Sequence, residues 1–201
     1  METTHTTISN RITGNGRENI PNLFFKMMTF LMKLSDLFAG QSERNFSRLP
    51  IKEGQIVVDY GCGPARYIKN ASETVGSNGR VFAVDIHPMA ISNVNRKIEK
   101  HALSNVEAIL ADGYSCAIPN RIADVVYALD MFHMIEHPTE LIRELARIVM
   151  YHGIIVIEDG HQPRTKTIEK IKNSGLLCIY SENKHHVVCK LKETKCLPPV
   201  S

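Results

Sequence analysis

The stretch VVDYGCGPARY at residues 57–67 combines small and charged residues in a spacing typical of a ligand-binding loop. Asp59 stands two places before Gly61, and Gly61 and Gly63 would let a ligand approach the main chain. In a dinucleotide-binding loop the sixth residue is small, whereas this chain has Arg66 there. Arginine at this place obstructs a pyrophosphate, and the Asp59 carboxylate repels one. The loop therefore disfavours NAD, and with it an NAD-dependent oxidoreductase, and favours a ligand that carries an ammonium group.

Two more aspartates follow apolar runs that are predicted to be strands. Asp85 ends the run 81–85, and a carboxylate there suits a ribose diol because it can accept hydrogen bonds from both hydroxyls. Asp112 follows the run 106–111, and it can accept from the exocyclic amine of an adenine; an Asx turn is its alternative interpretation. The predicted ligand thus has a cationic amine, a ribose diol and an adenine, but no phosphate.

The segment HMIEH at residues 133–137 matches a zinc-protease pattern in which two histidines share one face of a continuous helix. Pro138 follows at once and disfavours helical geometry at His137. The segment is therefore predicted to be a loop, and no metal site is expected.

Strands and helices alternate along the chain from residue 56 onward, as the apolar periodicity indicates. Such alternation is typical of a parallel sheet covered by helices on both faces, in which ligands bind at the carboxyl ends of the strands. The predicted strands are 56–60, 81–85, 106–111, 124–129 and 153–157, the helices are 64–75, 88–101, 138–150 and 165–174, and a final antiparallel hairpin comprises 176–181 and 186–191.

The composition is that of an ordinary soluble domain, with 201 residues of which 43% are hydrophobic and 22% are charged. The net charge of +3 gives no strong signal for nucleic-acid binding. The five cysteines include no C-x-x-C pair and are interpreted as reduced thiols. Together with the lack of a signal-peptide pattern, they predict a cytoplasmic protein.

The segment Leu23–Ala39 is predicted to be a helix whose apolar residues extend beyond a single stripe. It holds three of the eight methionines, and methionine adapts well to binding surfaces. A lid over a lipophilic substrate and a peripheral membrane contact both fit this pattern. Core packing and a dimer interface are the alternatives, so the sequence leaves open whether the chain is a monomer or a homodimer.

Taken together, these residues resemble the class I S-adenosylmethionine-dependent methyltransferases. The motifs of that family appear in order as VVDYGCGPA, VFAVDIHP, AILADG and ADVVYALDMFHMIEHP. The stretch ELIRELARIVMYHGIIVIED is similar to the next helix and the fifth strand of the family, with His152 in place of the first of two glycines. The likeness covers residues 51–191.

The resemblance implies a three-layer α/β architecture, the Rossmann-like methyltransferase fold. Its sheet is mostly parallel and seven-stranded, with a C-terminal antiparallel hairpin and an N-terminal helical lid. The implied organisation is an N-terminal helical extension at residues 1–50, a methyltransferase domain at 51–192 and a frayed tail at 193–201.

The cofactor implied by the resemblance is S-adenosyl-L-methionine, with S-adenosyl-L-homocysteine as its product. Asp59 is implied to bind the amino group through water, Asp85 the ribose, Ile86 the adenine ring and Asp112 its amine. Ile86 as a plain core residue is the alternative interpretation. The full set of implied cofactor-binding residues is Asp59, Gly61, Cys62, Gly63, Asp85, Ile86, Asp112, Gly113 and Asp130.

The implied reaction is in-line methyl transfer to a small-molecule acceptor. His133 is the candidate general base because it follows the fourth strand, where the substrate pocket of the family opens; a histidine packed against the pocket wall is the alternative. The chain has DMFH where amino-methyltransferases have [DNS]-P-P-[YFW]. This difference disfavours methylation of adenine N6, cytosine N4 or glutamine amides. A non-catalytic cofactor-binding sensor or partner subunit is the alternative function, which the missing glycine at His152 keeps open.

Overall fold

The computed structural model describes residues 20–192 of the chain. The predicted tail at 193–201 lies outside the described residues, and so does the start of the predicted N-terminal extension. Within residues 20–192 no helix is both long and apolar enough to cross a membrane. Cys62, Cys116 and Cys189 are free thiols. Cys178 is disulfide-bonded, so the prediction of five reduced thiols is wrong at that position.

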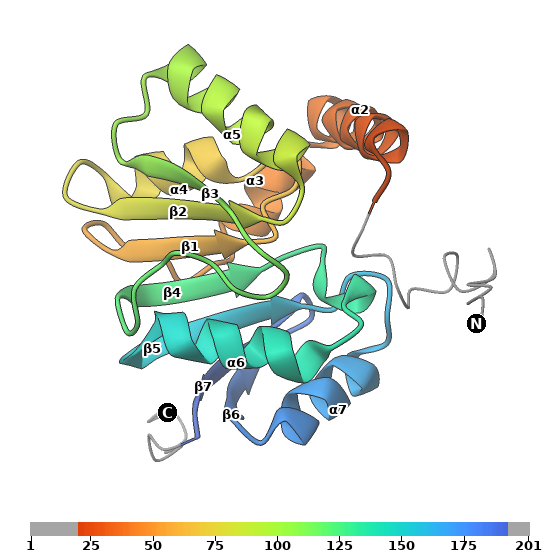
Figure 1. Ribbon diagram of the computed structural model, residues 1–201, viewed down its shortest axis with the longest axis vertical. Helices are drawn as coiled ribbons and strands as arrows, with labels where there is room; N and C mark the ends of the chain where they lie inside the picture. The colour runs from red at the N-terminus through yellow and green to blue at the C-terminus, as the bar shows by residue number, and fades with distance from the viewer. Residues whose placement is uncertain (1–19, 193–201) are drawn as a thin grey trace, which may run out of the picture.

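Seven strands form one sheet in the order β3-β2-β1-β4-β5-β7-β6 (Figure 1). Strands β1 to β5 pair in parallel, and β7 pairs antiparallel with both β5 and β6. The predicted mostly parallel sheet with a C-terminal hairpin is therefore confirmed. The strands are β1 (Ile56–Tyr60), β2 (Arg80–Asp85), β3 (Val106–Leu110), β4 (Ala123–Ala128), β5 (Val149–Glu158), β6 (Leu177–Glu182) and β7 (His186–Leu191).

Helices cover both faces of the sheet, which gives the three predicted layers (Figure 1). One buried core lies between the sheet and α6 and α7, and the other lies between the sheet and α2 to α5. The helices are α2 (Asn22–Ala39), α3 (Gln41–Phe46), α4 (Ile68–Val75), α5 (Pro88–His101), α6 (Pro138–Ile148) and α7 (Arg164–Ser174), with a short 3-10 turn, η1 (Phe132–Met134).

Local sequence explains most of these elements. The central strands are apolar runs because both of their faces are buried, as in β1, where four of the five residues are buried. Helix α6 begins at Pro138, whose fixed φ suits a first helical turn. It buries Leu141, Leu145 and Ile148, which lie three to four residues apart and so form one stripe.

The structure corrects three predicted boundaries. The helix expected at 64–75 begins at Ile68, because residues 64–67 form a turn with Ala65 at a left-handed φ of 63°. Helix α6 ends two residues early, since Val149 is already extended. The fifth strand, predicted at 153–157, therefore begins at Val149 and continues to Glu158. Helix α3 and the turn η1 were not predicted.

The segment HMIEH is not a continuous helix, in agreement with the prediction. It consists of the last two residues of η1 followed by extended backbone at Ile135. Among residues 20–192 no group of three or more His, Cys, Asp or Glu side chains is arranged to hold a metal ion.

Candidate functional site

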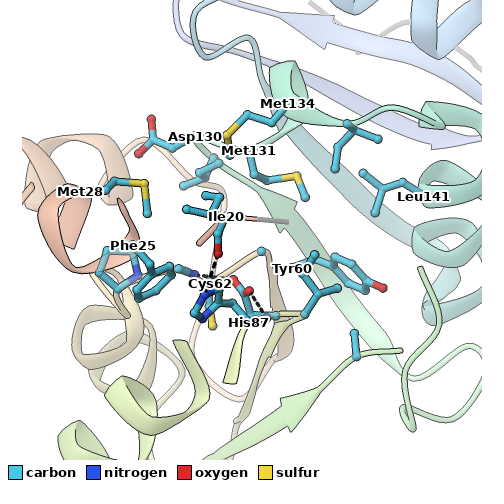
Figure 2. Close-up of a pocket in the computed structure, with 18 of the residues that line it drawn as sticks. Ile20, Phe25, Met28, Tyr60, Cys62, His87, Asp130, Met131, Met134 and Leu141 are labelled. Carbon is cyan, nitrogen blue, oxygen red and sulfur yellow. Dashed lines mark hydrogen bonds between the residues drawn. The ribbon is translucent and has the colours of Figure 1, made fainter. Parts of the chain in front are cut away.

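A cavity of about 350 Å³ opens at the carboxyl ends of β1, β2 and β4, beneath α2 (Figure 2). The strand order reverses between β1 and β4, and such a switch leaves a crevice outside the strand ends. Every predicted cofactor-binding residue except Asp59 lines this cavity. These lining residues are Gly61, Cys62, Gly63, Asp85, Ile86, Asp112, Gly113 and Asp130.

The loop after β1 requires its glycines for geometric reasons. Gly61 has a φ of 81°, and a Cβ there would lie 2.8 Å from Cγ of Met131. Gly63 has a φ of 51°. Between them Cys62 is buried, and burial raises the pKa of its thiol, so it is a neutral part of the wall.

Asp85 holds this loop in place. Its Oδ2 accepts from the Gly63 N–H at 2.8 Å, and its Oδ1 accepts from the His87 N–H at 2.8 Å. Burial raises the pKa of Asp85, and the two main-chain hydrogen bonds oppose that effect. Each carboxylate oxygen keeps acceptor capacity for a further hydrogen bond from the cavity.

Asp59 lies beneath the loop rather than in the cavity wall. The residue is only 1% exposed, and its Oδ2 has no hydrogen-bond partner within the described part of the chain. Burial, and next the Asp85 carboxylate, raise the pKa of Asp59 to about 8. Its predicted contact with an amino group through water stays a prediction.

The turn after β3 forms another part of the wall. Asp112 and Ser115 exchange two main-chain hydrogen bonds of 2.9 and 3.0 Å, and Gly113 between them has a φ of 57°. Asp112 is exposed in this turn and also lines the cavity. The hydrogen bonds of this turn join main-chain groups, so they are not those of the Asx turn that the sequence offered as an alternative.

Arg66 connects three parts of the structure. Its guanidinium, in a side chain that is 11% exposed, donates to Asp36 on α2 at 2.6 and 2.9 Å. It also donates to Oδ2 of Asp130 at 3.1 Å, and the Tyr67 hydroxyl donates to the same oxygen. The Asp130 N–H in turn donates to Glu158, whose pKa is raised to about 7 by burial and by Asp130. From the sequence, Arg66 indicated only that a pyrophosphate would be excluded, and no local pattern indicated this link.

The inner face of helix α2 lines the cavity, and its Phe25 also belongs to the buried core, which was one of the alternatives to a lid (Figure 2). Phe25 stacks on the His87 ring with 4.3 Å between ring centroids. The Met89 N–H donates to Nδ1 of His87, so Nε2 carries the proton and donates to the Ile20 carbonyl at 3.1 Å. Nothing in the sequence indicated that His87 would hold this helix.

The part of the cavity between α2 and the β4–α6 connection is mostly apolar. Met28 comes from α2, and Met131 and Met134 come from the connection (Figure 2). Leu141, from the first turns of α6, completes this apolar wall. The methionines make it adaptable in shape.

His133 is not among the residues that line this cavity. Its ring lies beside His161, with 5.0 Å between centroids, and a Cβ at Gly160 would overlap it. This position resembles the alternative of a packed histidine, so the geometry gives no support to a role as general base.

A family model described as a methyltransferase domain matches residues 51–196. The chain belongs to this family. Its fold is that of the class I S-adenosylmethionine-dependent methyltransferases, as the order of the seven strands shows.

The methyltransferase domain is similar to proteins with different acceptors. It is 33% identical over 112 residues to a probable cobalt-precorrin-6B C(15)-methyltransferase of Saccharolobus solfataricus, covering 56% of each chain. It is 29% identical over 132 residues to a protein-L-isoaspartate O-methyltransferase of Methanococcoides burtonii, covering 63% of this chain and 60% of that one. The chain thus spans somewhat more than half the length of these relatives.

A solved structure shares the fold of this methyltransferase domain. It is an S-adenosylmethionine-dependent methyltransferase from Aquifex aeolicus with a TM-score of 0.65 and 21% sequence identity, and the match covers 77% of this chain and 92% of that one.

The charges in the cavity of this methyltransferase domain fit S-adenosylmethionine. Arg66 is the one arginine or lysine among the described lining residues, and two carboxylates already neutralise it. The wall also presents the carboxyl groups of Asp85 and Asp112. An acidic cavity of this kind favours a sulfonium ligand and disfavours a pyrophosphate.

Proposed function

We propose that this domain transfers the methyl group of S-adenosylmethionine to a small, apolar acceptor. The observation that carries the proposal is one cavity whose lining combines two kinds of residue. Its polar lining comes from the glycine loop with Asp85 and Asp112, and its apolar lining includes the methionines and Phe25 of α2.

We assign the cofactor to the polar part of this lining. Asp85 would accept from the ribose hydroxyls while it holds Gly63 through the main chain. Asp112, Gly113 and Ile86 would surround the adenine. Gly61, Cys62 and Gly63 would lie along the methionine portion, with Asp130 at its edge and Asp59 supporting the loop from below.

The bound cofactor supplies a methyl group already activated by its positively charged sulfur. The residues of this chain therefore have to align the acceptor with the S–CH₃ bond and exclude water. Phe25 and Met28 on the inner face of α2 close the cavity from above, which provides the exclusion. Tyr60 would not act as a base, because its hydroxyl donates to the Tyr114 carbonyl at 2.8 Å and burial raises its pKa.

The acceptor class is inferred from the cavity, because the two relatives act on a cobalt-precorrin and on protein isoaspartate. Besides the glycine loop, the cavity wall offers thioethers and aliphatic groups from Met28, Met131, Met134 and Leu141. Such a wall gains free energy from covering apolar surface and offers few hydrogen bonds to a polar acceptor.

Calorimetry with S-adenosylmethionine, S-adenosylhomocysteine and NAD tests the cofactor assignment. We expect the first two to bind and NAD not to bind; binding of NAD alone would reject the proposal.

Incubation with labelled cofactor and a fractionated cell extract then tests the acceptor. Label in an organic-soluble product supports a small apolar acceptor, whereas label only in protein or nucleic acid contradicts it.

A further inference from the structure

The outer face of α2 is apolar and exposed. Phe30 is 65% exposed and Leu23 is 80% exposed, although both are large hydrophobic residues. These positions repeat at helical spacing, so they form one continuous stripe on the side opposite Phe25. The exposed apolar residues of α2 are Leu23, Phe24, Met27, Phe30, Leu31 and Leu34.

This stripe is unusual for a surface helix. An ordinary surface helix has one apolar face toward the core and a polar face toward solvent. Here the inner face, with Phe25 and Met28, already covers the cavity, so the outer stripe adds nothing to the core. In Figure 1, α2 lies at the periphery of the molecule and the sheet is on one side of it only.

Lysines border this stripe. Lys26 and Lys33 are two helical turns apart and therefore lie on the same flank of α2, and both are exposed. Burial lowers the pKa of Lys97 on α5, the Asp36 carboxylate opposes this effect, and the ammonium groups of Lys33, Lys100 and Lys69 lower the pKa further. Lysines from α2, α4 and α5 thus lie close to one another.

Carboxylates offset part of this charge. Asp36, the one acidic residue of α2, pairs with Arg66 and also interacts with Lys97. On α4, Glu73 pairs with Lys69 at 3.3 Å, and Glu99 is exposed on α5. The flank of the apolar stripe is therefore basic on balance.

Neither residues 1–19 nor a second copy of the chain fits this surface well. Residues 1–19 contain Met1, Ile8 and Ile12 as their large apolar residues, too few to cover six exposed side chains, and their Arg and Glu residues cancel. A second copy of the chain would present the same basic flank in a symmetric interface, with no acidic flank to meet it.

We propose that the outer face of α2 docks on the surface of an anionic phospholipid bilayer. The apolar stripe would enter the boundary between headgroups and acyl chains, and the lysines beside it would contact the phosphates. An apolar stripe with basic margins is the pattern of helices that lie in the plane of a membrane surface. The inner face of the same helix would keep covering the cavity, so docking would place the part of the cavity that α2 lines near the lipid.

A tryptophan reporter tests the docking without measuring methyl transfer, so its outcome is independent of the proposed reaction. The chain contains no tryptophan, so Phe30→Trp gives a single fluorescent site. On vesicles of phosphatidylcholine with phosphatidylglycerol, we expect a blue shift and quenching by brominated acyl chains. Tyr151→Trp is the matched control, because Tyr151 is 55% exposed on β5 and should show neither change. An unshifted spectrum at position 30, or equal shifts at both positions, would overturn the proposal.

Vesicle flotation gives the second test. The double variant Phe30→Ser with Leu31→Ser should bind anionic vesicles roughly tenfold more weakly or worse, while Tyr151→Ser binds like the unmodified chain. The double variant Lys33→Glu with Lys100→Glu should lose vesicle affinity by a comparable factor. Added salt should weaken the binding of the unmodified chain to the vesicles. Equal binding of all variants contradicts the proposal. A dimer in light scattering that the serine variant dissociates would instead assign the stripe to a second copy.

Discussion

At the scale of single residues, the Asp85 carboxylate has both a structural role and a proposed cofactor-binding role. Its carboxylate orients the main chain of the glycine loop through Gly63 and also faces the cavity. Asp85→Ala should therefore weaken S-adenosylmethionine binding by about 1.5–3 kcal/mol or more, the range for hydrogen bonds to a charged group. Calorimetry measures this, with Glu107→Ala on the exposed part of β3 as a control that keeps full affinity. Unchanged affinity in Asp85→Ala would show that the ribose assignment is wrong.

Asp59 gives a prediction for pH dependence. Its pKa of about 8 in the folded chain lies above the ordinary value near 3.9 for an aspartate. The folded state then binds the proton more tightly, so the free energy of unfolding falls as the pH rises from about 4 to about 8. Asp59→Asn removes this titration, and denaturant unfolding should show a variant more stable than the unmodified chain at pH 8, by on the order of 1 kcal/mol or more. Parallel pH profiles for the two chains would contradict the assignment.

His133 provides a test of what the reaction needs from the protein. Because its ring lies outside the cavity wall, His133→Ala should leave cofactor binding intact and change turnover by no more than about twofold. A general base contributes on the order of a hundredfold or more. Once an acceptor is known, a loss of that size without a change in cofactor affinity or melting temperature would restore the predicted role as base.

At the scale of elements, the Arg66–Asp36 pair is a partly buried polar link between α2 and the rest of the site. Asp36→Asn should free the helix without unfolding the domain, since Arg66 keeps its second partner, Asp130. Hydrogen exchange should then become roughly tenfold faster within α2 and stay unchanged in α6, which corresponds to losing about 1.4 kcal/mol of local stability.

Lys69→Ala is the matched control for that experiment. It breaks the exposed pair between Lys69 and Glu73 on α4, a type of pair that contributes little to stability. If this variant loosened α2 as much as Asp36→Asn does, the buried ion pair would not be the link that holds the helix.

At the scale of the whole molecule, ligand binding should raise the stability of the folded chain. A ligand that binds only the folded state at a hundred times its Kd stabilises it by about 2.7 kcal/mol. We expect S-adenosylmethionine and S-adenosylhomocysteine to raise the melting temperature in a concentration-dependent way, and NAD to leave it unchanged. A rise with NAD alone would contradict the acidic, pyrophosphate-excluding cavity.

The sequence by itself determined the alternation of strands and helices and the positions of the glycine loop, Asp85 and Asp112. These features depend on local patterns: apolar periodicity, the backbone freedom of glycine, and the rule that ligands gather at the carboxyl ends of parallel strands. A boundary such as the start of α4 was missed because Pro64 suits both a helix start and the turn that is found there.

The tertiary structure alone decided how these parts act together. Arg66 meets partners 30 residues before it and 64 residues after it, and Phe25 reaches His87 across a similar separation. The burial that raises the pKa of Asp59, and the packing of His133 against Gly160 and His161, likewise arise only when several elements come together. No local pattern encodes such contacts, because they depend on the distance between elements in the folded chain.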